Sequence, residues 1–157
     1  MKSIIGVGLS LLLITGCGKN VTLEDLTGSY PDDVGQPMEE LTSEQQELVG
    51  VPDKLPFEEK SVEAHVSKEN EQLSEIELIY HGEKTTLSTI TVLRDMEIHV
   101  NPDRQINMDS GAVASVMTEG ETTRIEWYNS TRDVIYQLVY EGKDPDLAQV
   151  METVNSI

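Results

Sequence analysis

The one cysteine of this chain, Cys17, stands directly after an apolar run that carries no charge. Lys2 precedes the run, which covers residues 4–14, and the small residues Thr15 and Gly16 separate it from the cysteine. A bilayer span needs about 20 apolar residues, whereas the apolar core of a signal peptide needs roughly 7–15. The run therefore predicts a signal peptide. Cys17 has no second cysteine to pair with, so its thiol is free for other chemistry.

The pattern Leu13-Ile14-Thr15-Gly16-Cys17 resembles the lipobox of bacterial lipoproteins. That resemblance implies that residues 1–16 are removed and that Cys17 is acylated on its thiol and becomes the mature N-terminus. One acyl chain anchors a protein only marginally, but a diacylglyceryl group holds it stably. We therefore expect a protein attached by lipid, palmitate being typical, to the extracytoplasmic face of the cell membrane.

The charge balance is strongly acidic, with 29 acidic and 11 basic residues and a net charge of -18. Phosphate binding requires clustered Lys and Arg, so nucleic acid is excluded as a natural partner. Adsorption to anionic lipid headgroups also favours basic segments. The acidity leaves three interpretations: divalent-cation binding, docking to a basic partner, or a solvated surface that keeps an exported protein dispersed. The last of these is favoured.

Two groups of side chains have the donor atoms of metal ligands but lack the sequence spacing of known metal-binding motifs. Four oxygen-bearing residues suit Ca²⁺ but do not follow the order of an EF-hand loop: Asn101, Asp103, Asn107 and Asp109. Three histidines lie far apart, without a cysteine among them: His65, His81 and His99. We expect a polar turn and surface histidines, and neither a metal nor a cofactor. No Gly-x-Ser-x-Gly nucleophile elbow is present, so we expect a protein that is not an enzyme.

The mature chain divides into a tether and one domain. Residues 17–41 are acidic and broken by Gly28, Pro31, Gly35 and Pro37, which predicts a flexible tether. Residues 42–157 form the predicted domain. It opens with a short helix over 42–49, for which Ser43 and Gln46 fit a capping box, and which Gly50 ends.

From Ser61 onward apolar residues alternate with polar ones, which predicts about seven strands. A hairpin turn is expected at residues 81–84, with Gly82 at positive φ. Met96, Ile98 and Val100 form one of the alternating sets. The ending changes to helical spacing, with Asp144 as N-cap and Pro145 at the first helical position. Its apolar residues recur every three or four positions, at Leu147, Val150, Met151, Val154 and Ile157. The predicted fold is α+β: a curved antiparallel meander sheet with a short N-terminal helix and an amphipathic C-terminal helix packed on it.

The late aromatic residues supply the one candidate ligand cleft. Trp127, Tyr136 and Leu138 fall on predicted strand faces directed at the final helix. They could line a cleft for an apolar ligand, although such residues more often fill a core.

The path from Leu55-Pro56-Phe57 to the closing Asn155-Ser156-Ile157, through Ile125-Glu126-Trp127, resembles a bacterial domain of unknown function. That domain ends many exported lipoproteins, sporulation-associated proteins and anti-sigma-factor-like proteins of Gram-positive bacteria. The resemblance covers about residues 45–157 and extends to the lipoprotein-carrier and sigma-regulator fold, whose members hold acyl chains or peptides in a concave sheet. This chain departs from it in having only one clear helix at its C-terminus, which argues against a deep cavity.

Two functions follow as expectations. The first is a domain without enzymatic activity that binds a protein or envelope component through its sheet face or acidic surface. The alternative is a carrier or sensor of a lipid or other small apolar ligand held between sheet and helix, which depends on the fold resemblance alone. Hydrolysis of an envelope component is a third and weaker hypothesis.

Overall fold

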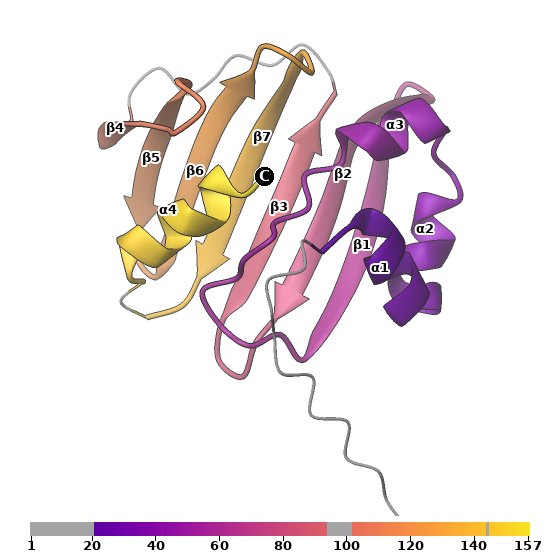
Figure 1. Cartoon of the computed structure of the whole chain (residues 1–157), viewed down its shortest axis with the longest axis horizontal. Helices are drawn as coiled ribbons and strands as arrows, with labels where there is room; N and C mark the ends of the chain where they lie inside the picture. The colour runs from indigo at the N-terminus through magenta and orange to yellow at the C-terminus, as the bar shows by residue number, and fades with distance from the viewer. Residues whose placement is uncertain (1–20, 94–101, 144) are drawn as a thin grey trace, which may run out of the picture.

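A computed structural model describes residues 21–93, 102–143 and 145–157 of the chain. Its centre is one antiparallel sheet of seven strands in the order β1-β2-β3-β7-β6-β5-β4 (Figure 1). The strands are β1 (Ser61–Glu69), β2 (Gln72–His81), β3 (Thr86–Val92), β4 (Arg104–Asn107), β5 (Val113–Glu119), β6 (Thr122–Asn129) and β7 (Val134–Glu141). The predicted α+β class, with helices near both ends of the chain, is confirmed.

The strand order joins two meanders. Strands β1 to β3 form one and β4 to β7 the other, and they meet where β3 pairs with β7. The central contact pairs Thr89 with Leu138. A single continuous meander would instead have placed β4 beside β3. Strand β4 therefore lies at the far edge, opposite β1.

All the described helices lie on one face of the sheet (Figure 1). Four short ones precede the sheet: α1 (Leu23–Ser29), the π-helical turn η1 (Pro31–Gly35), α2 (Gln36–Met38) and α3 (Ser43–Leu48). They cover β1 and β2 and are called the cap here. The final helix, α4 (Leu147–Asn155), lies over β5 to β7. Residues 49–57, the strap, pass between these two coverings in front of β3.

The prediction of a flexible tether over residues 17–41 is wrong for its described part, 21–41. Four side chains of this segment are buried in the core: Leu26, Val34, Met38 and Leu41. The cap helices pack against β1, and Lys68 on that strand forms a 2.8 Å ion pair with Glu40. The glycines and prolines that suggested a linker instead divide the segment into short helices.

The strap is held by polar side chains that rise from the sheet. Thr89 Oγ1 donates to the Gly50 carbonyl at 2.7 Å, and the Gly50 N–H donates to Thr91 Oγ1 at 3.0 Å. A side chain at Gly50 would place its Cβ 3.0 Å from the Tyr136 ring. At its middle the strap binds the C-cap of α4, since the Asp53 N–H donates to Ser156 Oγ at 3.1 Å. Two buried threonines thus have their hydrogen bonds satisfied by backbone that crosses over them.

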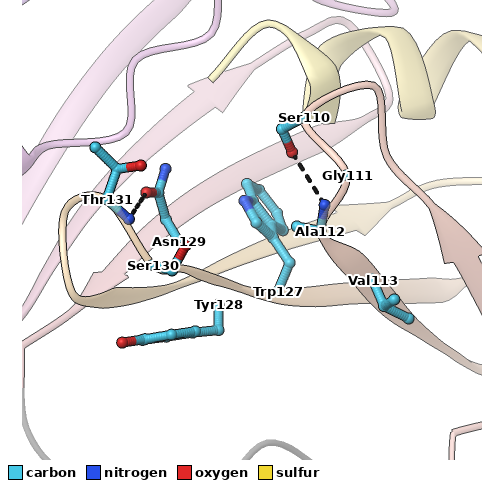
Figure 2. A pocket seen from close by; sticks show the side chains of 9 residues that line it. All are labelled: Ser110, Gly111, Ala112, Val113, Trp127, Tyr128, Asn129, Ser130 and Thr131. Atoms are coloured by element: carbon cyan, nitrogen blue, oxygen red, sulfur yellow. Dashed lines mark hydrogen bonds between the residues drawn. The ribbon is translucent and has the colours of Figure 1, made fainter.

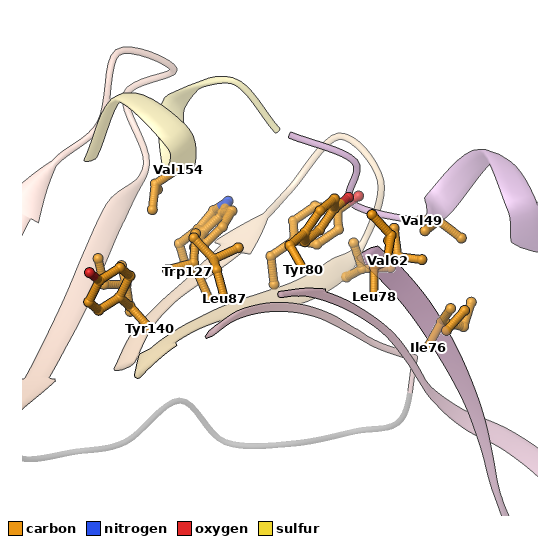
Figure 3. Packing of buried hydrophobic residues seen from close by; sticks show 14 of the residues in the cluster. Val49, Val62, Ile76, Leu78, Tyr80, Leu87, Trp127, Tyr140 and Val154 are labelled. Atoms are coloured by element: carbon orange, nitrogen blue, oxygen red, sulfur yellow. The ribbon is translucent and has the colours of Figure 1, made fainter. Parts of the chain in front are cut away.

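The core lies between the sheet and these coverings (Figure 3). Alternate residues of β2 point into it, and Ile76 and Leu78 are fully buried. From α4 the core receives Val150 and Val154, which the predicted amphipathic spacing had identified. Leu55 and Phe57 of the strap pack at its margin.

Three local predictions need correction. The N-cap of the last helix is Asp146, whose side chain accepts from the Ala148 N–H, rather than Asp144, which lies outside the described residues. The short helix spans Ser43–Leu48, and its capping box joins Thr42 to Gln45, one residue earlier than predicted. Gly82 does not have positive φ. A side chain there is excluded because its Cβ would lie 2.8 Å from the Phe57 ring.

The burial of the cap predicts its contribution to stability. We expect Met38→Ala to lower the free energy of unfolding by about 2–5 kcal/mol, because it removes a fully buried side chain and leaves a cavity. The exposed neighbour Gln36→Ala serves as the control and should change it by less than about 0.5 kcal/mol. Urea unfolding measures both. Equal stabilities for the two variants would mean that the cap does not belong to the folded body.

Candidate functional site

The residues predicted to line a ligand cleft lie in a filled core. Trp127 and Tyr136 pack ring against ring, with centroids 5.5 Å apart and planes tilted by 37°. Leu138 is fully buried beside them, and Tyr136 is 1% exposed. Neither Tyr136 nor Leu138 borders a described hollow, so the front of the sheet offers no opening at these two residues.

The Tyr136 hydroxyl makes two hydrogen bonds within the fold. Arg132 Nη1 donates to the hydroxyl at 2.8 Å, and the hydroxyl donates to the Leu48 carbonyl at 2.7 Å. Burial raises the pKa of Tyr136, while the hydrogen bond and charge of Arg132 oppose the shift. The hydroxyl therefore joins β7 to the end of α3 and is engaged in holding the fold.

Trp127 also borders a hollow at one corner of the sheet, which is the best candidate for a binding site (Figure 2). This corner hollow has a volume of about 450 Å³ and is lined by residues 110–113 and 127–131. It lies where the loop before β5 meets the end of β6. Two large apolar side chains at its margin are solvent-exposed: Val113 at 46% and Tyr128 at 44%.

Turn chemistry fixes the rim of the corner hollow. Asn129 Oδ1 accepts from the backbone N–H groups of Thr131 and Arg132, both at 3.1 Å, which closes the turn into β7. The Tyr128 hydroxyl donates to Asp133 Oδ1 at 2.6 Å. That hydrogen bond raises the pKa of Tyr128. The exposed ring is thereby held in one position, as a rigid contact surface.

The back face of the sheet, opposite the helices, carries a mixture of charge and apolar surface. Glu63 and His81 form a 2.9 Å pair there, with both side chains about two-fifths exposed. Nearer the centre, Ser115, Glu126 and Gln137 follow one another across β5, β6 and β7 and are buried. The back face is therefore polar at its β1–β2 side and closely packed at its centre.

The candidate metal ligands do not converge. Across residues 21–93, 102–143 and 145–157 no group of three His, Cys, Asp or Glu side chains is placed to hold a metal ion. His65 is exposed on β1, while His81 ends β2 rather than lying in a turn. His99 and Asn101 lie outside the described residues, as do Met96, Ile98 and Val100.

The oxygen-bearing loop residues have separate local roles. The Asp103 carboxylate accepts from the Thr118 N–H at 2.7 Å. The Asp109 N–H donates to Asn155 Oδ1 on α4 at 3.2 Å, which joins the loop before β5 to the last helix. Asn107 ends β4. These contacts fasten the edge of the sheet.

Tyr80 is a feature that the sequence analysis missed. Its side chain is buried, and within the described ranges its hydroxyl has no hydrogen-bond partner. Burial raises the pKa of Tyr80 above its ordinary value, and the nearby Glu59 carboxylate adds to the shift. Apolar alternation places Tyr80 in a strand but cannot reveal whether a hydroxyl finds a partner, so no sequence signal existed.

Comparison with known proteins gives no relative: no family model, no curated protein and no solved structure matches the chain. None of the helices in the described ranges is long and apolar enough to cross a membrane.

The two buried tyrosines form a matched pair for measurement. We expect Tyr136→Phe to lower the free energy of unfolding by about 1–2 kcal/mol, because the Leu48 carbonyl loses its donor and Arg132 its acceptor. Tyr80→Phe removes a hydroxyl that has no partner, so stability should stay unchanged or rise by up to about 1 kcal/mol. Urea unfolding at neutral pH compares them. A loss at Tyr80 as large as that at Tyr136 would contradict the assigned contacts.

The raised pKa values also predict sensitivity to alkali. In the unfolded chain tyrosines ionise near pH 10, whereas Tyr80 and Tyr136 keep their protons to higher pH in the fold. The folded state then binds more protons than the unfolded state, so stability is complete below about pH 10 and falls as pH rises beyond it. Unfolding free energies measured from about pH 8 to pH 11 should show this fall. The fall should be shallower in Tyr80→Phe, and an unchanged slope would show that Tyr80 does not contribute.

Proposed function

We propose that this protein is a lipid-anchored domain without enzymatic activity that binds a protein or other envelope component at the extracytoplasmic face of the cell membrane. The observation that carries the proposal is the sequence Leu13-Ile14-Thr15-Gly16-Cys17, which follows a charged residue and an apolar run. Cys17 would bear a diacylglyceryl group after residues 1–16 are removed.

The binding part of the proposal is supported by the corner hollow. Tyr128 and Val113 expose apolar surface beside it, and Tyr128 is held by Asp133. A rigid tyrosine buries a large area on binding and loses little conformational freedom, which is why tyrosine is common at protein interfaces. Two polar side chains around the hollow, Ser110 and Asn129, accept hydrogen bonds within their own turns. That arrangement suits recognition better than bond-making chemistry.

The packing of the core favours surface binding over the carrier alternative. A carrier needs an enclosed apolar space, typically of about 300–1,000 Å³. The described hollows reach that size, but they are open to solvent and have polar as well as apolar linings. Trp127 and Tyr136 contact each other in the space that an acyl chain would occupy.

Lipid attachment is tested on the intact protein in a bacterial host. We expect the wild-type chain to remain in the membrane pellet through a high-salt wash and to carry a diacylglyceryl mass on Cys17, because two acyl chains bind stably. Cys17→Ala should lack that mass and keep residues 1–16. The control Lys19→Ala leaves the pattern complete and should behave as wild type. An unmodified Cys17 in a chain that has lost its leader would refute lipid anchoring.

A further inference from the structure

The described part of the folded body includes Thr22, which lies only five residues after the proposed anchor. Thr22 is the N-cap of α1, and its hydroxyl accepts from the Asp25 N–H at 3.1 Å. In return the Thr22 N–H donates to the Asp25 carboxylate at 3.1 Å. This capping box fixes the first turn of the cap immediately after Val21.

The cap is an integral part of the folded body and does not act as a tether between the anchor and the body. Val34 and Met38 are at most 1% exposed, and Leu26 and Leu41 are nearly as buried. Gln46 Nε2 donates to the Met38 carbonyl at 2.9 Å, which joins α3 to α2 within the cap. Unfolding the cap would lengthen the connection to the anchor, but it would also expose these apolar side chains to water.

Chain geometry then limits how far the body can stand from the lipid. Five residues in fully extended conformation span at most about 18 Å, whereas a tether reaching to residue 41 would span roughly 80–90 Å. We propose that this short leash, the connection from Cys17 to Val21, holds the domain close to the outer surface of the bilayer. The inference rests on the proposed lipid anchoring of Cys17.

Charge works against direct adsorption of the cap to the lipid surface. The segment from residue 21 to 49 has no Lys, Arg or His. It contains eight acidic residues: Glu24, Asp25, Asp32, Asp33, Glu39, Glu40, Glu44 and Glu47. Anionic headgroups repel such a surface, since attraction to them needs basic residues. The leash therefore keeps the folded body close to the membrane, although the charge of the cap does not attract it to the headgroups.

The reach of the leash is measured by energy transfer on the lipidated full chain in vesicles. The vesicles contain phosphatidylcholine, phosphatidylglycerol and an acceptor-labelled lipid, and the donor is attached to Gln72→Cys, an exposed position at the start of β2. A Gly/Ser linker of about 20 residues inserted between Asn20 and Val21 raises the root-mean-square reach from about 12 Å to about 28 Å. We expect transfer efficiency to fall by about half or more, and the same linker added after Ile157 to leave it unchanged.

Equal transfer in the wild-type and inserted chains would overturn the short leash. Absence of the diacylglyceryl mass on Cys17 would instead refute the anchoring on which it rests, so the two failures are distinguishable.

Discussion

The width of the sheet determines most of this structure. Adjacent strands lie about 4.8 Å apart, so the outer axes of seven strands are separated by roughly 29 Å. One helix with its side chains is only about 10–12 Å across. The nine-residue α4 can therefore cover about a third of the apolar face. The rest needs further covering, and the chain supplies it from the cap and the strap.

The need to cover the rest of the sheet explains why polar residues lie inside the fold. A strap is extended backbone, and its N–H and C=O groups require partners once buried. Thr89 and Thr91 provide them for Gly50, and the Tyr136 hydroxyl provides one for Leu48. Because Gly50 has no side chain, the strap can lie directly on the Tyr136 ring. The space between the sheet and its coverings is thus filled by the chain itself.

The elements with a regular pattern could be predicted from the sequence. The segments that cover the sheet could not, because their conformation depends on the surface against which they pack. Alternation identified the strands, and spacing of three and four residues identified α4 with its buried Val150 and Val154. The cap was missed because Gly28, Pro31, Gly35 and Pro37 suggested a linker. A signal was nevertheless present, since its buried and half-buried apolar residues recur every three or four positions: Leu23, Leu26, Tyr30, Val34, Met38 and Leu41. Their spacing continues across the breaks between helices. It indicates burial only once the apolar face of the sheet that these residues cover is known.

The same reasoning accounts for what was and was not foreseen at the candidate site. Trp127, Tyr136 and Leu138 were predicted from their strand faces, and a face directed at the helices becomes core once cap, strap and helix are all in place. Tyr128, one residue from Trp127, points to the opposite face because side chains alternate along a strand. It escapes burial at a corner where β6 ends and the chain turns through Asn129 and Asp133. Corners of a sheet are where side chains stay exposed on a rigid frame, so an interaction surface is expected there rather than in the filled interior.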